Sequence, residues 1–247
     1  EHPLEDNIIM NSIKSKISSI IRKIFKMQDF SRSKISYSQI GEDLLIRYIF
    51  NVKGIKNISY IDIGAHDPFY LSNTALFYET GSTGINVEAN PVLFNIFEVS
   101  RKKDINLNIG ICEKEGDLDF YVFHETALST FNSLEAERLV REEAKILDKK
   151  IKVNVVSINK VIDKYLKGIA PDFLNLDAES MDIAILKSLN FDKFAPKVIC
   201  VETISYSNTF FGVKNEEIKN FLISKGYFLF GDTYVNSIFV KRSFWLG

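Results

Sequence analysis

Four acidic residues stand at or near the ends of short apolar segments that are typical of buried β-strands. They are Asp62 in segment 58–63, Glu88 in 84–88, Asp177 in 172–177 and Glu202 in 197–202. Ligands of parallel sheets bind outside the carboxyl ends of the strands. We therefore expect the four carboxylates at one sheet edge, where they can accept hydrogen bonds, attract a cation or take up a proton.

A turn follows the first of these carboxylates, with the sequence Asp62-Ile63-Gly64-Ala65-His66. Gly64 permits a tight turn in which backbone can approach a ligand closely. After the next predicted strand, Glu88 is placed to accept hydrogen bonds from a ribose diol, as acidic residues do in nucleoside-binding sheets. The two features together indicate a nucleoside cofactor.

Two other kinds of protein would use a similar sheet. A nucleotide-sugar oxidoreductase or epimerase needs a Gly-x-Gly-x-x-Gly turn, whereas Gly64 lies between Asp62 and Asp67, which would repel a pyrophosphate but suit a sulfonium and an ammonium. No tyrosine has a lysine four residues later. A non-catalytic module on the same kind of fold would keep the core but lose the polar groups that bind the cofactor, whereas Asp62, Glu88 and Asp177 are all present here. Both classes remain alternatives.

The segments between the carboxylates alternate between strand and helix patterns. The expected helices are one capped by Ser38 with its body at 44–50, then 72–80, one from Asn90-Pro91, 132–150, 181–189 and 215–225, and the further strands are 105–109, 117–123, 151–156, 227–230 and 235–241. This alternation predicts an α/β fold, a mostly parallel sheet with helices on both faces.

The first residues differ from the rest. Apolar residues recur at helical spacing over 9–25 with lysine and arginine between them, and 28–34 has the composition of a linker. We therefore predict an N-terminal amphipathic helix and linker at 1–35 and a single domain at 36–247. Packing of the helix on the domain, or on a second subunit in a homodimer, is favoured over binding to a membrane surface.

Composition excludes several classes. The 247 residues are 46% hydrophobic and carry a net charge of −1, so a globular domain is expected and a field that attracts nucleic acid is not. Cys112 and Cys200 lie in predicted strands and suit a core better than a metal or disulfide. Neither a membrane span nor a secretion signal is apparent, which favours a cytoplasmic protein.

Several blocks in order resemble the FkbM family of S-adenosylmethionine-dependent methyltransferases over roughly residues 36–239. The blocks are Ser38-Gln39-Ile40-Gly41-Glu42-Asp43, Asp62-Ile63-Gly64-Ala65-His66-Asp67-Pro68, Ser72-Asn73-Thr74, Gly84-Ile85-Asn86-Val87-Glu88-Ala89-Asn90-Pro91, Leu128-Ser129-Thr130 and Leu176-Asp177-Ala178-Glu179. The resemblance implies a Rossmann-like class I methyltransferase fold, with a seven-stranded sheet, one antiparallel strand near the C-terminus, and O-methylation as the activity.

The resemblance also implies which residues bind the cofactor. They are Gln39, Asp43, Asp62, Gly64, Ala65, Asn73, Glu88, Ala89, Asn108 and Asp177. Asp62, Gly64 and Ala65 would line the methionine portion, and Glu88 the ribose. Gln39 and Asp43 would reach the pocket from the preceding helix. Asn73 would open a helix whose free N–H groups receive the cofactor carboxylate, and Asn108 would meet the adenine edge or be an ordinary polar strand end.

Methyl transfer to a hydroxyl needs a base or a metal to make the oxygen nucleophilic. Asp177, Glu179 and Glu202 form an acidic cluster that could supply either, and Asp177 with Glu202 could hold Mg2+ or Mn2+. His124 is the preferred histidine base, with an ordinary loop histidine as the equal alternative. His66 is expected to have a local hydrogen-bonding role.

The acceptor expected from the resemblance is a sugar hydroxyl, on a nucleotide-activated sugar or a surface polysaccharide of the capsule or O-antigen type. Tyr206, Phe210 and Phe211 could stack on a sugar face or simply pack. The chain has Ser180 where family members commonly have glycine, and Ala89 where they often have proline. The Ser180 difference bears on how closely backbone approaches the acceptor.

Overall fold

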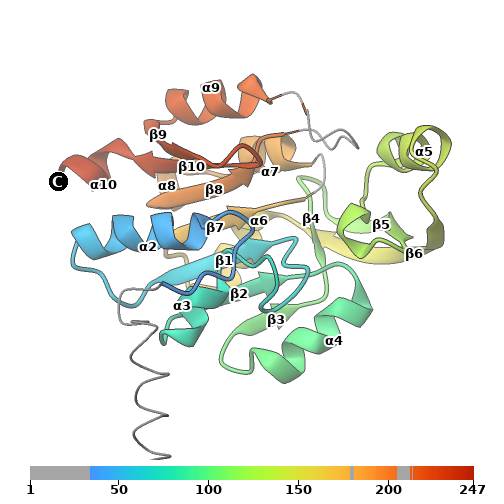
Figure 1. Cartoon of the computed structure of the whole chain (residues 1–247), viewed down its shortest axis with the longest axis horizontal. Helices are drawn as coiled ribbons and strands as arrows, with labels where there is room; N and C mark the ends of the chain where they lie inside the picture. The colour runs from blue at the N-terminus through green and yellow to red at the C-terminus, as the bar shows by residue number, and fades with distance from the viewer. Residues whose placement is uncertain (1–33, 179–180, 205–211, 213) are drawn as a thin grey trace, which may run out of the picture. The chain divides into compact units, whose positions relative to one another are not determined.

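The computed structural model describes residues 34–178, 181–204, 212 and 214–247 (Figure 1). Within these residues, seven strands form the main sheet in the order β3-β2-β1-β7-β8-β10-β9. Their bounds are β1 Ser59–Ile63, β2 Thr83–Val87, β3 Ile105–Leu107, β7 Phe173–Leu176, β8 Val198–Glu202, β9 Tyr227–Asp232 and β10 Asn236–Lys241. β10 runs antiparallel to β8 and β9, and the other pairs are parallel. The predicted fold is confirmed, including the antiparallel strand near the C-terminus.

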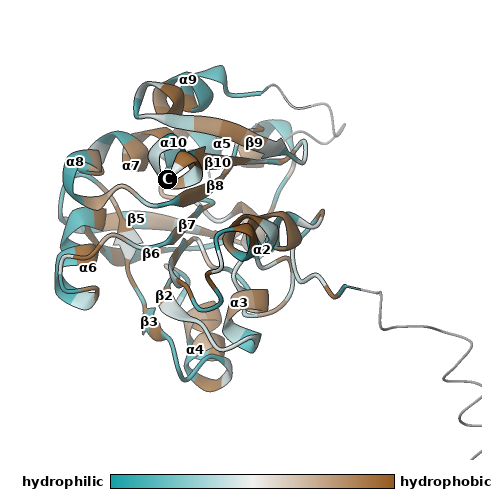
Figure 2. Cartoon of the chain, turned by 90° about the vertical axis from the view of Figure 1, so that its left-hand side faces the viewer, coloured by the Kyte–Doolittle hydropathy of each residue, from teal (hydrophilic) through white to brown (hydrophobic). Residues whose placement is uncertain are grey.

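Helices cover both faces of this sheet. Their bounds are α2 Glu42–Val52, α3 Ala75–Glu79, α4 Pro91–Ser100, α6 Ile158–Tyr165, α7 Asp182–Ser188, α8 Phe191–Phe194, α9 Glu216–Ser224 and α10 Arg242–Leu246. Successive strand residues point to opposite faces, so Ile61 packs in one core with α6, α7 and α9, while Tyr60 packs in another with α2 and α3. Hydrophobic residues accordingly concentrate on the strands, while the hydrophilic colour marks much of α6 and α8 (Figure 2).

Some helix starts agree with the sequence, although the N-cap residue of α2 is Gly41 and not the expected Ser38. Asn90 accepts a hydrogen bond from the backbone of Val92 and Pro91 is the first residue of α4, as expected. α2 begins with the expected acidic turn of Glu42 and Asp43. α6 and the short helices α8 and α10 were not among the predicted elements.

A second sheet lies beside the first, in the order β4-β6-β5. Its strands are β4 Gly110–Ile111, β5 Gly116–Phe123 and β6 Leu147–Val156, and a 3-10 helix, η2 Thr126–Leu128, and α5 Ser133–Glu142 connect β5 to β6. The helix predicted over 132–150 is therefore too long. It ends because Ala144 has a left-handed backbone conformation, with φ of 52°, and β6 then pairs with β5 from Leu147 onward.

The strand predicted at 105–109 is also shorter than expected. Ile105–Leu107 pairs with β2, whereas Gly110–Ile111 pairs with β6, so the chain changes sheets at Asn108 and Ile109. None of the helices in the described part of the chain is long and apolar enough to span a membrane. The predicted N-terminal helix lies outside the described residues.

Candidate functional site

A pocket of about 300 Å3 opens at the carboxyl ends of β1, β2, β7 and β8. All four carboxylates expected at this edge line it: Asp62, Glu88, Asp177 and Glu202. Further residues named in the sequence analysis that line it are Gln39, Gly64, Ala65, His66, Asn73 and Ala89. The sheet therefore brings together side chains that the sequence placed in separate segments.

Gly64 occupies a position that no other residue can take without strain. Its φ is +75°, and a Cβ added there would lie 1.8 Å from the carbonyl oxygen of Asp177. The backbone N–H groups of Gly64 and Ala65 both donate to the carbonyl of Val87, and that of Asp177 donates to Ile63. Glycine is thus required because the ends of β1 and β7 meet here, a reason beyond the expected approach to a ligand.

The Glu88 carboxylate is held from two sides. Its oxygens accept hydrogen bonds from the backbone N–H of His66 at 2.8 Å and of Asn90 at 2.7 Å. Burial raises the pKa of Glu88 to about 7; the two hydrogen bonds oppose that rise and the nearby Asp62 carboxylate adds to it. Each oxygen accepts one of these bonds and keeps a second lone pair that can accept from a ribose hydroxyl.

Both carboxylate oxygens of Asp62 accept hydrogen bonds from side chains of the protein. One oxygen accepts from the Thr74 hydroxyl at 2.6 Å and the other from the Asn175 amide at 2.8 Å. Burial raises the pKa of Asp62, while these two bonds and the charge of Arg101 lower it. Asp62 lines the pocket and also joins its walls.

Asn73 does not open the following helix. α3 begins at Ala75, and the Ser72 hydroxyl accepts hydrogen bonds from the backbone of Thr74 and Ala75, so the capping contacts belong to Ser72. Asn73 instead donates through its amide nitrogen to Asn175 at 2.9 Å. Its side-chain oxygen is buried without a hydrogen-bond partner in the described structure. The expected helix-terminus role is therefore wrong, and a five-residue helix offers little dipole to support it.

Asp177 and Glu202 meet at the ends of β7 and β8. Asp177 is exposed and lines the pocket. Desolvation of its carboxyl and the nearby Asp182 carboxylate raise the pKa of Asp177 to about 7, while a side-chain hydrogen bond with Glu202 lowers it. Among residues 34–178, 181–204, 212 and 214–247, no group of three or more His, Cys, Asp or Glu side chains could hold a metal ion.

Two predicted cofactor residues lie outside the pocket wall. Asp43 accepts hydrogen bonds from Ser36, Ser38 and the backbone of Tyr37, so its carboxylate fastens the segment before α2. Asn108 donates to the backbone carbonyls of Glu88 and Ala89 at 2.8 and 3.1 Å. Neither lines the pocket, because nearby hydroxyl and backbone groups already engage these short side chains.

The two histidines differ in position: His66 makes a local hydrogen bond, as expected, whereas His124 lies outside the pocket wall. His124 is exposed, does not line the pocket and contacts Ile146 through its backbone, so its selection as the base is not supported. His66 lines the pocket, and its Nε2 atom forms a 2.9 Å hydrogen bond with the Thr126 hydroxyl of η2. Burial lowers the pKa of His66, opposed by Asp67. The predicted roles of Glu179, Tyr206, Phe210 and Phe211 lie outside the described residues.

Many residues of the pocket wall were not among the candidate site residues predicted from the sequence. These residues are Leu93, Ile109, Ile111, Phe120, Thr126, Ala127, Leu128, Ser129, Thr130, Phe131, Asn175, Met181 and Asn236. Leu128-Ser129-Thr130 carried a signal as part of the family resemblance. Asn175 carried another, because an amide within an otherwise apolar strand must have a buried partner.

The family model described as "Methyltransferase FkbM domain" matches residues 62–229. No curated protein matches the chain. A methyltransferase FkbM from Methylobacillus flagellatus KT is 13% identical with a TM-score of 0.46, the match covering 75% of this chain and 44% of that one, so the chain spans less than half of that protein.

Two further structures cover almost the whole chain. A putative caffeoyl-CoA O-methyltransferase from Staphylococcus aureus is 10% identical with a TM-score of 0.45, over 97% of this chain and 100% of that one. The 1,6-didemethyltoxoflavin-N1-methyltransferase from Burkholderia thailandensis, solved with 1,6-didemethyltoxoflavin and S-adenosylhomocysteine, is 8% identical with a TM-score of 0.40, over 97% and 89%.

Proposed function

Because the chain belongs to the FkbM methyltransferase family, we propose that it transfers the methyl group of S-adenosylmethionine to a sugar hydroxyl. Its strand order and antiparallel β10 are those of the Rossmann-like class I methyltransferase fold. The acceptor in this proposal is a nucleotide-activated sugar or a surface polysaccharide. The observation that carries it is the single pocket wall shared by Gly64, Glu88, Asp177 and Glu202.

The pocket fits the cofactor in size and in chemistry. A volume of about 300 Å3 is at the lower end of the range for small-molecule sites. The carboxylates of Asp62, Glu88 and Asp177 give it a negative wall, which suits a ligand with a sulfonium and an ammonium. Ala89, Leu93 and other apolar residues offer a surface for an adenine ring beyond Glu88.

The chain's own residues divide the work along the pocket. Glu88 accepts from the ribose hydroxyls, held in place by the backbone of His66 and Asn90. Asn108 serves this end indirectly, since it ties down the Glu88 and Ala89 carbonyls rather than meeting the adenine. The turn at Gly64 and Ala65 borders the methionine portion. Gln39, Glu202 and Asn236 lie on the remaining wall and can hydrogen-bond the acceptor's hydroxyls.

The cofactor supplies an electrophilic methyl group, so that a carbon–oxygen bond forms as the carbon–sulfur bond breaks and S-adenosylhomocysteine leaves. The acceptor hydroxyl loses its proton in this step, and Asp177 is the group we assign to receive it. Its raised pKa makes it a stronger base than an ordinary carboxylate, and the contact with Glu202 fixes its position. Alignment of oxygen and methyl supplies much of the rate. We derive no step through a metal ion.

Isothermal titration with S-adenosylhomocysteine tests the cofactor part. We expect micromolar binding by the wild-type protein, and weakening by Glu88→Gln of about tenfold or more, corresponding to the loss of one or two hydrogen bonds to a charged group. Glu98→Gln is the matched control, because Glu98 is an exposed glutamate on α4 that does not line the pocket. A folded wild-type protein that does not bind would refute the methyltransferase proposal.

The proposal that a sugar hydroxyl accepts the methyl group is tested by identifying the reaction product. Incubation with S-adenosylmethionine and nucleotide sugars or oligosaccharides, with and without Mg2+, should give a methylated product by mass spectrometry and an O-methyl signal by NMR. Binding without any methylation across these acceptors, or methylation at nitrogen, would contradict the sugar O-methylation proposal. Activity that strictly requires Mg2+ would contradict the metal-free assignment of Asp177.

A further inference from the structure

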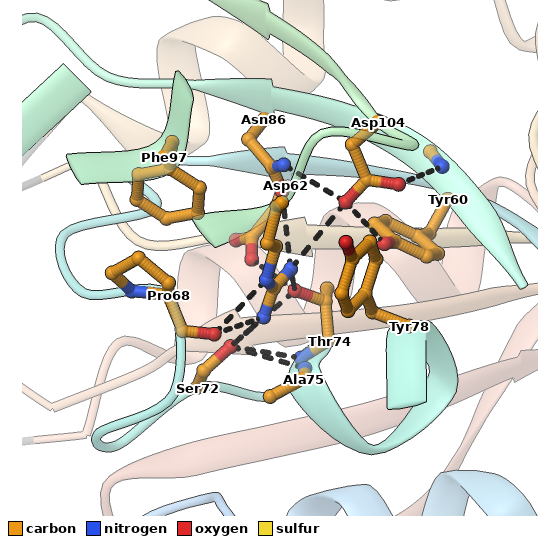
Figure 3. Close-up of polar contacts among 12 residues, drawn as sticks. Tyr60, Asp62, Pro68, Ser72, Thr74, Ala75, Tyr78, Asn86, Phe97 and Asp104 are labelled. Atoms are coloured by element: carbon orange, nitrogen blue, oxygen red, sulfur yellow. Dashed lines mark hydrogen bonds and ion pairs between the residues drawn. The ribbon is translucent and has the colours of Figure 1, made fainter. Parts of the chain in front are cut away.

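Arg101, the C-cap residue that follows α4, is fully buried. Its guanidinium donates to the Pro68 carbonyl at 2.9 Å, the Ser72 hydroxyl at 2.9 Å and the Thr74 hydroxyl at 2.7 Å. Figure 3 shows Pro68, Ser72, Thr74, Asn86 and Asp104 arranged around this network of polar contacts. Burying a charged guanidinium costs free energy, and these hydrogen bonds offset part of that cost. A buried arginine at this position therefore suggests a specific role.

The direction of the hydrogen bonds supplies one. An arginine can only donate, so the Thr74 oxygen must accept from Arg101. The single proton of the Thr74 hydroxyl is then left for Asp62, to which it donates at 2.6 Å. The Asn175 amide donates to the other Asp62 oxygen. In this series of hydrogen bonds Asp62 only accepts, which is the arrangement that an ionised carboxylate requires.

We propose that Arg101 is a positioning residue for the cofactor, which acts through Thr74 to keep Asp62 ionised and through Pro68 and Ser72 to hold the loop that forms the adjoining wall. The inference rests on the proposed function for the identity of the ligand. It assigns to Arg101 a charge role and a geometric role, which experiments can separate.

The charge role follows from the surroundings of Asp62. Burial favours its neutral form, and the charge of Arg101 opposes this. The titratable groups coupled to Asp62 by charge are Arg101, Asp104, Tyr60, Glu88, Asp177 and Cys200. Asp104 is itself engaged by the Tyr60 hydroxyl at 2.6 Å and by the backbone of Gly84 at 2.8 Å. Arg101 is the cation of this set, since the others are acidic groups.

The geometric role follows from the loop between β1 and α3. Arg101 binds the carbonyl of Pro68 and the hydroxyl of Ser72, which stand before and after the loop's exposed tip at Tyr70 and Leu71. Ser72 and Leu71 line the pocket. The rings of Phe69, Tyr78 and Phe97 surround the guanidinium with centroids 5.5 to 5.8 Å away, so its position is fixed.

The experiment measures the dissociation constant of S-adenosylhomocysteine from pH 6 to pH 9 for Arg101→Met, Arg101→Lys and Thr74→Val. At each pH the value for the variant is divided by the value for the wild type. Loss of the Arg101 charge raises the pKa of Asp62, so more of it is protonated at low pH and the cationic ammonium binds less well. We expect the ratio of dissociation constants for Arg101→Met to be about tenfold larger at pH 6 than at pH 9. Glu88 and Asp177 titrate in the wild type and in the variants alike, so their effect on the dissociation constant cancels in the ratio.

Two variants separate the roles. Arg101→Lys keeps the charge but not the planar set of donors, so it should weaken binding by a similar factor at every pH. Thr74→Val removes one hydroxyl between Arg101 and Asp62 and leaves the arginine in place, so it answers the question if Arg101→Met fails to fold. It should show the same pH-dependent ratio. Arg138→Met is the matched control: Arg138 pairs with Glu135 and Glu143 on α5 and does not line the pocket.

A ligand-free measurement keeps this inference separate from the proposed function. Carboxyl 13C NMR, with Asp62→Asn to assign the signal, should show a higher pKa for Asp62 in Thr74→Val than in the wild type. If the wild-type protein binds no S-adenosylhomocysteine while this shift is seen, the proposed function fails and the charge role stands. Equal Asp62 pKa values in the two proteins, or affinity ratios that are flat with pH for Arg101→Met and Thr74→Val, would overturn it.

Discussion

The two halves of the pocket edge are built on different principles. At the ends of β1 and β2, Asp62 and Glu88 accept hydrogen bonds from neutral donors on four different residues, and the Gly64 turn is closed by backbone contacts. At the ends of β7 and β8, Asp177 and Glu202 meet each other and Asp182 adds a third carboxylate. In the first half neutral donors fix the carboxylates in place, as a cofactor site needs. In the second half acidic groups lie against one another, which suits a base.

Gly64→Ala tests the rigid geometry at the ends of β1 and β2. A Cβ 1.8 Å from the Asp177 carbonyl must move the backbone of β1 or β7, and we expect a loss of more than about 4 kcal/mol in the free energy of unfolding. Urea denaturation measures it.

Gly54→Ala provides the matched control for that substitution. Gly54 also has a positive φ, of +69°, but nothing lies within 4 Å of its added Cβ, so only the backbone strain of about 1 kcal/mol is expected. Equal losses in the two variants would mean that the β1–β7 junction is looser than the structure shows.

Asp177→Asn examines the other half. The amide cannot take the acceptor's proton, so we expect kcat to fall by about 10^2- to 10^4-fold. The dissociation constant of S-adenosylhomocysteine should change by a few-fold only, because Glu88 and the Gly64 turn are untouched. Single-turnover methylation and calorimetry give the two numbers.

Glu202→Gln accompanies it as the partner variant. It should lower kcat less, since Glu202 fixes the base rather than receiving the proton. A larger effect on kcat than that of Asp177→Asn would reverse the assigned roles of the two carboxylates.

The smallest expected effect concerns pH and stability at Glu88. Its folded pKa of about 7 lies above the ordinary value of 4.5, so the folded protein holds a proton that the unfolded chain has lost between these values. The contribution of Glu88 to stability is therefore fully present below pH 4.5 and falls as the pH rises toward 7, by at most about 3 kcal/mol.

Thermal unfolding of the ligand-free protein from pH 4.5 to 8 checks this. Glu88→Gln should flatten the decline, because the amide does not titrate. A wild-type protein whose stability rises through this range in parallel with the variant would show that Glu88 is ionised throughout, and the two halves of the pocket edge would then differ more in protonation than we infer.

Much of the fold was readable because it depends on local patterns. Short apolar runs separated by amphipathic segments predicted the main strands, and the Asn90-Pro91 signal placed α4 correctly. Errors arose where distant pairing decided the outcome: residues 147–150 became strand because β5 lies alongside, and the chain changed sheets after Leu107 because β6 was there to pair with Gly110.

The candidate site divides in the same way. The sequence by itself determined that Asp62, Glu88, Asp177 and Glu202 would meet, because parallel strands bring their carboxyl ends to one edge. It could not show that nearby hydroxyl and backbone groups engage Asp43 and Asn108, or that His124 lies outside the pocket. Nor did it show that Arg101 supports Asp62 through Thr74. The tertiary structure decides those outcomes, because they depend on which hydrogen-bond donors and acceptors the packed chain brings within about 3 Å of each side chain.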